Sequence, residues 1–248
     1  MNSFIYNNKS SLLKIKRAFN SLIGIEIVKY PTDELDRRIK LINNYNIDVI
    51  LDIGANIGQY GGEMRNLGFK GEIRSFEPMK KAFSILEKNA SKDKNWKVFN
   101  YSIGERDGET TINVAKNSVS SSLLKNLPQL TESAPEAAFI EKETIEIKKL
   151  DSIFESLNLN GKNVYLKIDT QGYEEMVLIG AEKSLEFVTG IQIEMSFIPT
   201  YEGGITFDKM KTKLNDLGFH LMALENGFYD KKTGKQIEID GIFYKKQI

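Results

Sequence analysis

The sequence contains no cysteine, which excludes disulfide bonds, thiolate metal sites and a cysteine nucleophile. It also has no excess of either charge, because 34 Lys and Arg residues balance 34 Asp and Glu residues. This balance disfavours a dedicated nucleic-acid-binding protein. Apolar runs of the roughly 18 residues that span a bilayer are missing, as is a leader-like N-terminal segment. We therefore expect a soluble, cytoplasmic protein that folds by packing a core.

The most informative stretch is an apolar run followed by an acid and a glycine turn. Residues 49–53 predict a buried parallel strand, and Gly54 and Gly58 predict a tight turn that leads into a helix. The G-x-x-x-G spacing differs from the G-x-G-x-x-G of dinucleotide-binding turns, so a pyrophosphate is not the expected ligand. On this motif alone, a purely structural turn is an equally open interpretation.

A second strand predicted at residues 72–76 ends in Phe76-Glu77-Pro78. In a right-handed β-α-β unit the two strands end on the same edge of the sheet, so Asp52 and Glu77 would face one crevice. A carboxylate at this position can accept two hydrogen bonds from a ribose diol. Pro78 disfavours helical geometry at Glu77 and so keeps this acid in an extended conformation.

Two later strands also end in acids. The run from Val164 ends at Asp169 and a glycine turn, and the strand predicted at 190–195 presents Glu194. Because α/β sheets bind ligands outside the carboxyl ends of their strands, we expect Asp52, Glu77, Asp169 and Glu194 to converge on one cleft. Each acid taken singly is more often a helix cap, so the repetition carries the argument.

The remaining pattern completes a β-α-β series. The final two strands have no helix between them and must therefore pair antiparallel. Asp151 is a plausible N-cap of the helix that starts at Leu150. We predict helices at 33–44, 80–89, 175–186 and 207–217, and strands at 97–101 (ending at Ser102-Ile103-Gly104), 110–114, 144–147, 219–224 and 241–245.

Two segments fall outside this series. Residues 117–138 are polar and serine-rich and predict either a lid or binding loop or a disordered surface loop. Residues 11–23 place apolar side chains at helical spacing with Lys14, Lys16 and Arg17 between them. This basic amphipathic helix would pack on the domain or on a homodimer partner, or alternatively contact the inner face of a membrane peripherally.

These motifs together resemble the FkbM-type family of S-adenosylmethionine-dependent methyltransferases, over roughly residues 48–244. The resemblance implies a Rossmann-like α/β fold of the class I methyltransferase type, with a seven-stranded, mostly parallel sheet, an antiparallel C-terminal strand and helices on both faces. We therefore expect an N-terminal helical extension at 1–47 and a methyltransferase domain at 48–248. The resembling blocks are Asp52-Ile-Gly-Ala-Asn-Ile-Gly58, Phe76-Glu77-Pro78, Leu166-Lys-Ile-Asp169-Thr-Gln-Gly-Tyr-Glu174 and Ile193-Glu194-Met-Ser196.

The resemblance further implies S-adenosylmethionine as methyl donor and an oxygen acceptor, often on a sugar, a glycan or another biosynthetic intermediate. On this basis we assign a set of hypothetical cofactor contacts. The backbone of Gly54, Ala55, Asn56 and Gly58 would hold the methionine moiety, Asp52 would support this turn or the amino group, Glu77 followed by Pro78 would bind the ribose, Ser102 and Ile103 would border the adenine, and Asp169 would line the same site.

The group that accepts the hydroxyl proton is left open among Asp169, Glu174, Glu194 and His220, with Asp169 favoured as a metal-free base. Asp169 and Glu194 could instead bind Mg²⁺ through their oxygens, although a third ligand is not evident. His220 lies in an apolar strand pattern, where packing is the more ordinary role. The alternative function is a catalytically inactive nucleotide-binding or scaffold module associated with glycan-assembly enzymes. A nicotinamide oxidoreductase ranks third because of the glycine spacing.

Overall fold

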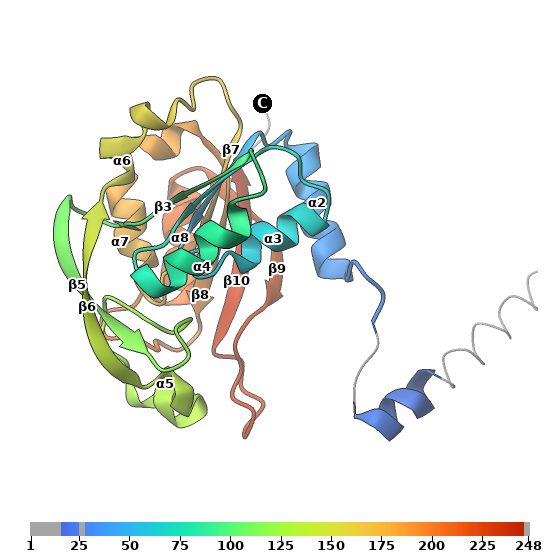
Figure 1. Ribbon diagram of the computed structural model, residues 1–248. Helices are drawn as coiled ribbons and strands as arrows, with labels where there is room; N and C mark the ends of the chain where they lie inside the picture. The colour runs from blue at the N-terminus through green and yellow to red at the C-terminus, as the bar shows by residue number, and fades with distance from the viewer. Residues whose placement is uncertain (1–15, 25–27, 246–248) are drawn as a thin grey trace, which may run out of the picture. The chain divides into compact units, whose positions relative to one another are not determined.

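The structure is a computed structural model that describes residues 16–24 and 28–245 (Figure 1). The chain divides into two compact units, residues 1–38 and 39–248, and the predicted boundary after residue 47 lies within the larger unit. In the smaller unit, residues 16–23 are helical. Residues 11–15, the first part of the predicted amphipathic helix, lie outside the described residues. Within the described part of the chain, no helix combines the length and apolar character needed to cross a membrane.

The larger unit is built on a seven-stranded sheet with the order β3-β2-β1-β7-β8-β10-β9. Pairs among β3, β2, β1, β7 and β8 are parallel, whereas β10 is antiparallel to both of its neighbours. The predicted α/β fold with a mostly parallel sheet and an antiparallel C-terminal strand is therefore confirmed. The strands are β1 (Val49–Ile53), β2 (Glu72–Phe76), β3 (Trp96–Phe99), β7 (Val164–Ile168), β8 (Val188–Ser196), β9 (Phe219–Asn226) and β10 (Glu238–Lys245).

Helices cover both faces of this sheet, and the alternation of side chains along the strands explains why. Leu51 of β1 packs into one apolar cluster with α6, α7 and α8, whereas its neighbour Ile50 packs into a second cluster with α3, α4 and the end of α2. Figure 1 shows α3 and α4 crossing in front of the strands. The helices are α2 (Asp33–Asn44), α3 (Gln59–Asn66), α4 (Lys80–Ala90), α6 (Leu150–Ile153), η2 (Glu155–Leu157), α7 (Glu174–Gly180) and α8 (Phe207–Asp216).

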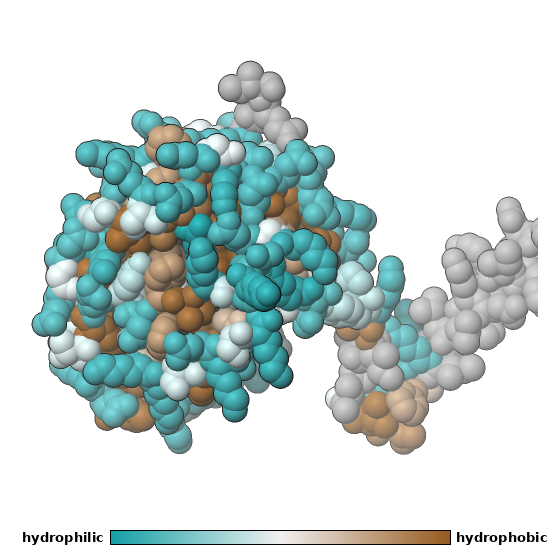
Figure 2. All heavy atoms as spheres, turned by 45° about the horizontal axis from the view of Figure 1, so that its top comes forward, coloured by the Kyte–Doolittle hydropathy of each residue, from teal (hydrophilic) through white to brown (hydrophobic). Residues whose placement is uncertain are grey.

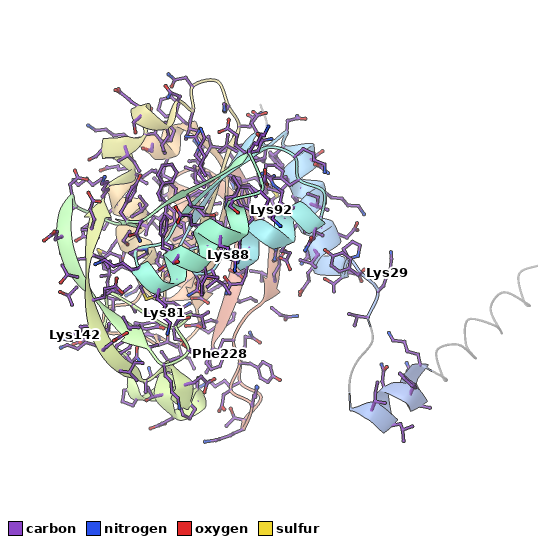
Figure 3. All side chains as sticks on the ribbon, in the orientation of Figure 1. Lys29, Lys81, Lys88, Lys92, Lys142 and Phe228 are labelled. Carbon is purple, nitrogen blue, oxygen red and sulfur yellow. The ribbon has the colours of Figure 1, made fainter. Side chains whose placement is uncertain are left out.

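Helix α4 illustrates how sequence spacing sets these contacts. Ala82 and Leu86, four residues apart, lie on the same face of the helix and are buried. Lys81 and Lys88 are exposed on the other side, and Figure 3 shows both side chains along this helix. Figure 2 shows hydrophobic side chains in patches among hydrophilic ones on the face that it draws.

A second, three-stranded sheet has the order β4-β6-β5. It consists of β4 (Ser102–Ile103), β5 (Gly108–Ala115) and β6 (Phe139–Lys148), with β5 and β6 antiparallel as the predicted extra hairpin requires. The sequence-based prediction was wrong in making Ser102 and Ile103 the end of the third strand, because β3 ends at Phe99 and these two residues pair with β6. The chain leaves the large sheet before it reaches them.

Residues 117–138, which we call the rim segment, have no regular spacing of apolar side chains. Hydrogen bonds hold this segment in place instead. Ser121 and Ser122 are buried, and their hydroxyls bind the backbone at Ala115, Leu124 and Gln171. The segment also contains α5 (Pro128–Ser133) and η1 (Pro135–Ala137). The disordered-loop alternative is therefore wrong, and a role of the segment as a lid or binding loop stays a prediction.

The predicted N-cap role of Asp151 is also corrected. The residue at the N-cap of α6 is Lys149, and the Asp151 carboxylate accepts hydrogen bonds from the backbone N–H groups of Lys183 and Ser184 at 3.1 and 2.8 Å. It therefore caps η3 (Ser184–Phe187), a separate turn after α7. The predicted helix 175–186 is divided into α7, which ends at Gly180, and η3. Gly180 packs against Gly104, where an added Cβ would lie 1.8 Å from the Gly104 carbonyl oxygen.

Candidate active site

Acidic side chains gather at the carboxyl edge of the large sheet, as predicted. Asp169 follows Ile168, Glu194 follows Ile193, and these two preceding residues are paired in the parallel ladder between β7 and β8. Glu194 is in turn opposite Asp240 of β10. Asp52 lies one strand away on β1 and is close enough for its charge to act on that of Asp169. The edge therefore brings together residues from four strands that are far apart in the sequence.

Asp52 is fully buried between β2 and β7. Its Oδ2 accepts a hydrogen bond from the Ser75 hydroxyl at 3.0 Å, whereas its Oδ1 has no hydrogen-bond partner among the described residues. Burial raises the pKa of Asp52, and the nearby Lys167 ammonium partly opposes this effect. An orphaned buried oxygen of this kind leaves one acceptor for a donor group of a ligand.

The glycine turn after β1 is pressed against the end of β7. Gly54 has a φ of +82°, and a Cβ at this position would lie 1.9 Å from the Asp169 carbonyl oxygen, so the residue must be glycine. The backbone N–H groups of the turn are already used inside the protein. Gly54 and Ala55 donate to Phe76, Asn56 to Glu77, Ile57 to the Asn56 side chain, and Gly58 to Ala55. The turn is therefore no anion cradle of the phosphate-binding type.

Glu77 connects this turn to the start of α4. Its carboxylate accepts hydrogen bonds from the backbone N–H of Asn56 at 2.9 Å and of Met79 at 2.8 Å. Only 3% of the residue is exposed, and this burial raises its pKa to about 7 despite the two hydrogen bonds. Glu77 thus links the turn after β1 to the residue that precedes α4, and the crevice beside it stays a prediction.

Asp169 is partly accessible to solvent, with 36% of its side chain exposed. Its Oδ2 accepts a hydrogen bond from Lys167 Nζ at 2.8 Å, and its Oδ1 accepts one from Gln171 Nε2 at 2.8 Å. Desolvation alone would raise the pKa of Asp169, but the Lys167 charge and these hydrogen bonds outweigh it and lower the pKa. Asp169 is therefore held as a carboxylate.

Glu194 and Glu174 lie close to Asp169 but in a different electrostatic state. Burial raises the pKa of Glu194 well above its usual range, and the negative charges of Glu238 and Asp169 raise it further. Burial likewise raises the pKa of Glu174 to about 7. The Glu174 Oε1 accepts hydrogen bonds from Thr170 N at 2.9 Å and Gly172 N at 3.2 Å, so this residue braces the turn after β7.

The comparison with known families assigns this arrangement. A family model described as the methyltransferase FkbM domain matches residues 52–221, more than half of the chain and all four strand-end acids. The chain belongs to this family. As an FkbM methyltransferase it is an S-adenosylmethionine-dependent enzyme, which agrees with the sheet order described above. No curated protein matches the chain.

Solved structures with a similar fold to this FkbM methyltransferase are distant in sequence. A SAM-dependent methyltransferase from Aquifex aeolicus is 10% identical, with a TM-score of 0.42, and the match covers 83% of this chain and 87% of the other. Fibrillarin from Aeropyrum pernix, solved with natively bound S-adenosyl-L-methionine, is 12% identical with a TM-score of 0.45, and the match covers 78% and 66% of the two chains.

Several predicted site residues lie within the FkbM domain but make few polar contacts. Ala55 is buried in the cluster beneath α3 and α4. Ser102 and Ile103 are buried in β4, and Ile103 packs into the apolar cluster on the α6–α8 side of the large sheet. Any contact of Ile103 with an adenine would therefore need its backbone rather than an exposed side chain. The role of Ser102 and Ile103 stays a prediction.

His220 is not brought to the carboxyl edge. It lies at the start of β9, opposite Tyr244, and Tyr244 is paired with Gly190 at the start of β8. The parallel strands end, not start, at the Asp169 and Glu194 edge, so His220 lies at the opposite edge of the sheet. We therefore leave it out of the catalytic set of this FkbM methyltransferase.

The predicted Mg²⁺ site is not supported either. Over residues 16–24 and 28–245, no group of three or more His, Cys, Asp or Glu side chains is arranged to hold a metal ion. The two proposed ligands are Asp169 and Glu194, and the amide nitrogen of Gln171 donates to both of them. Lys167 occupies the other oxygen of Asp169. These donors do not fit a cation, so we derive no step through a metal.

Lys167 and Gln171 lie within the block 166–174, but the sequence alone predicts no role for them. Lys167 is only 6% exposed and lies two residues before Asp169, so the period of two along a strand places both side chains on the same face. The sequence signal for the pair of Lys167 and Asp169 is a lysine in an otherwise apolar strand, two residues before the acid that follows the strand. The Gln171 contact with Glu194 joins two strand ends and had no comparable signal.

Proposed function

We propose that this FkbM methyltransferase transfers a methyl group to a hydroxyl group of a sugar, a glycan or another biosynthetic intermediate. The observation that carries the proposal is the state of Asp169, an ionised and partly exposed carboxylate at the carboxyl edge, one strand away from the buried Asp52. A hydroxyl nucleophile has to lose its proton, and a fixed carboxylate within reach of solvent can accept it. Asp169 would be this acceptor.

The low pKa of Asp169 does not weaken this role. S-adenosylmethionine, when bound, supplies a methyl group on a positively charged sulfur. An alcohol oxygen that has accepted a methyl group but still carries its proton is a far stronger acid than a carboxylic acid. A carboxylate that Lys167 keeps ionised can therefore take the proton, and its charge also favours a cationic donor nearby.

The residues at this edge fit the donor on their own chemistry. The orphaned Oδ1 of Asp52 would accept a hydrogen bond from an amino group, and the Glu77 carboxylate would accept the ribose hydroxyls. The backbone N–H groups of the turn at Gly54 are hydrogen-bonded within the protein. This disfavours binding of a pyrophosphate and hence of a dinucleotide cofactor. The chain would thus bind and orient the donor mainly through carboxylates.

Mass spectrometry of ligands retained through purification tests the donor, followed by calorimetric titration with S-adenosylmethionine. Glu77→Ala should weaken that binding, and an unchanged affinity would reject the ribose role of Glu77. Sugar nucleotides and glycan fragments are then screened for the gain of one methyl group. Tight donor binding without transfer to any hydroxyl acceptor would favour the inactive nucleotide-binding or scaffold module instead.

We further propose a peripheral contact of residues 11–23 with anionic membranes. The support is the basic character of this segment together with the apolar side chains of Phe19 and Leu22. Flotation with anionic liposomes compares the full chain with a chain that starts near Tyr30. Equal flotation of the two would reject the contact, and the oligomeric state measured on the same samples tests a homodimer.

A further inference from the structure

Gln171 has an unusual backbone conformation next to the proposed proton acceptor. Its φ is +56°, which lies in the left-handed region. Residues other than Gly, Asn and Asp rarely adopt this backbone conformation. The turn is held in place by Glu174 and by its fit against Tyr201, because a Cβ on Gly172 would lie 2.7 Å from Tyr201 Cβ. A strained residue that is fixed this firmly at an active site points to a functional constraint.

The side-chain amide of Gln171 joins the two catalytic candidates. Its Nε2 donates to Asp169 Oδ1 at 2.8 Å and to Glu194 Oε2 at 2.9 Å, which uses both amide hydrogens. Its Oε1 accepts a hydrogen bond from the Tyr201 hydroxyl at 2.8 Å. If the amide were flipped, its oxygen would lie against the carboxylate oxygens of Asp169 and Glu194. The hydrogen-bond network therefore determines the orientation of the Gln171 amide.

The same tyrosine belongs to the packing of the rim segment. Tyr201 is 1% exposed and packs with Leu130, Ala134 and Ala137. Its hydroxyl also lies 3.2 Å from the Ser120 carbonyl oxygen, so one proton is shared between the rim segment and Gln171. A second link is direct, because the Ser122 hydroxyl donates to the Gln171 carbonyl oxygen at 2.6 Å.

We propose that Gln171 is a positioning residue that couples the seating of the rim segment to the geometry of the Asp169 and Glu194 side chains. An acceptor that binds against the rim segment would then hold the two carboxylates in their present arrangement. Movement of the rim segment away from Gln171 and Tyr201 would loosen that arrangement. The inference rests on the proposed function, since it takes these carboxylates to be the catalytic groups. It assigns to the rim segment, and within it to residues 117–127 that include Ser120 and Ser122, a part in recognising the acceptor.

The test uses the full chain without any acceptor and three variants. Tyr201→Phe removes one hydroxyl that touches neither carboxylate, and Gln171→Met removes the amide at similar length. Gln171→Asn tolerates the left-handed backbone better and is one methylene shorter, so it remains informative if Gln171→Met folds poorly. The control is Asn163→Leu, which removes a side-chain amide that donates to the Asn46 carbonyl oxygen just before β7, at the opposite edge of the sheet.

Two measurements are made on each variant. Hydrogen exchange of peptides covering residues 117–127 reports the rim segment, and the side-chain carboxyl carbon resonances of Asp169 and Glu194 report the pair. We expect exchange to become roughly fivefold faster in Tyr201→Phe, about the loss of one hydrogen bond, and faster in both Gln171 variants as well. Both carboxyl resonances should move in all three variants, while those of Glu72 and Asp107 stay in place.

Coupling is overturned if Tyr201→Phe speeds up exchange and leaves both carboxyl resonances unmoved, since the segment would then loosen without any effect on the pair. It is also overturned if the Gln171 variants leave exchange unchanged, or if Asn163→Leu reproduces their effects. Titration of the parent chain with S-adenosylmethionine separates this inference from the proposed function. If S-adenosylmethionine binds but the variants show no coupling, the inference alone is rejected. If S-adenosylmethionine does not bind, the proposed function is rejected, and the exchange and resonance data still test the coupling between the rim segment and the two carboxyl groups.

Discussion

Lys167 Nζ lies 2.8 Å from Asp169 Oδ2, and the two residues stand two positions apart on the same side of β7. The lysine is buried, whereas the aspartate reaches the solvent. This asymmetry has a consequence for stability, because removing one partner of such a pair leaves the other charge without compensation.

We therefore expect Lys167→Met to destabilise the protein by about 2 kcal/mol, less than the roughly 3–5 kcal/mol of a fully buried pair, because solvent screens Asp169. The pKa of Asp169 should rise with the loss of the neighbouring positive charge. Urea denaturation of Lys167→Met, Asp169→Asn and the double variant gives the interaction energy. The double variant should recover most of the loss, and strictly additive effects would contradict the pairing.

The contact between Gly54 and Asp169 predicts a large effect from a single methyl group. Gly54→Ala places a Cβ against the Asp169 carbonyl oxygen at a φ of +82°, so we expect a loss of more than about 3 kcal/mol together with impaired donor binding. Gly62→Ala is the matched control, because no atom lies within 4 Å of its added Cβ and it lies in α3. That variant should be neutral or more stable by about 0.5–1 kcal/mol. Equal effects of the two substitutions would refute the steric argument.

The raised pKa of Glu77 predicts a pH-dependent stability. Between its unfolded value near 4.5 and its folded value of about 7, the folded protein binds a proton that the unfolded chain has lost. Stability therefore falls as pH rises through this range, by roughly 3 kcal/mol for this group. Glu77→Gln should lack this component of the slope in chemical denaturation between pH 4.5 and 8, whereas the exposed control Glu87→Gln should keep it. A Glu77→Gln profile parallel to that of the parent would contradict the prediction.

The donors around Asp169 predict that chelation has no effect on donor binding. Lys167 and Gln171 already occupy the carboxylate oxygens that a divalent ion would need. Calorimetric titration with S-adenosylmethionine should give the same affinity in EDTA and in Mg²⁺. A gain in affinity with Mg²⁺ that Asp169→Asn abolishes would restore the metal site.

The fold was predictable because its signals are local. Apolar runs that end in an acid and a glycine, such as Asp52-Ile-Gly54, mark both a buried parallel strand and the turn after it. The acids at Asp169 and Glu194 could be placed at one edge for the same reason, since parallel strands end together. The absence of a helix before the last strand similarly required the antiparallel pairing of β9 and β10.

The missed features depend on contacts across the fold. Asp151 could equally cap its own helix or another, and only the packing of η3 beside it decides the outcome in favour of Ser184. The rim segment has no apolar period, because its order comes from side chains such as Ser121 and Ser122 that bind the backbone. His220 had the composition of a catalytic residue, but the direction of β9 places it at the wrong edge.

The close approach of Gly54 to the Asp169 carbonyl oxygen makes the loops that follow β1 and β7 structurally dependent on each other. Neither loop can be exchanged for that of another methyltransferase unless its counterpart is transplanted with it, because the backbone of one fills the space that a side chain on the other would occupy. Chimeras designed to alter acceptor choice should therefore keep these two loops as a cassette and vary the rim segment.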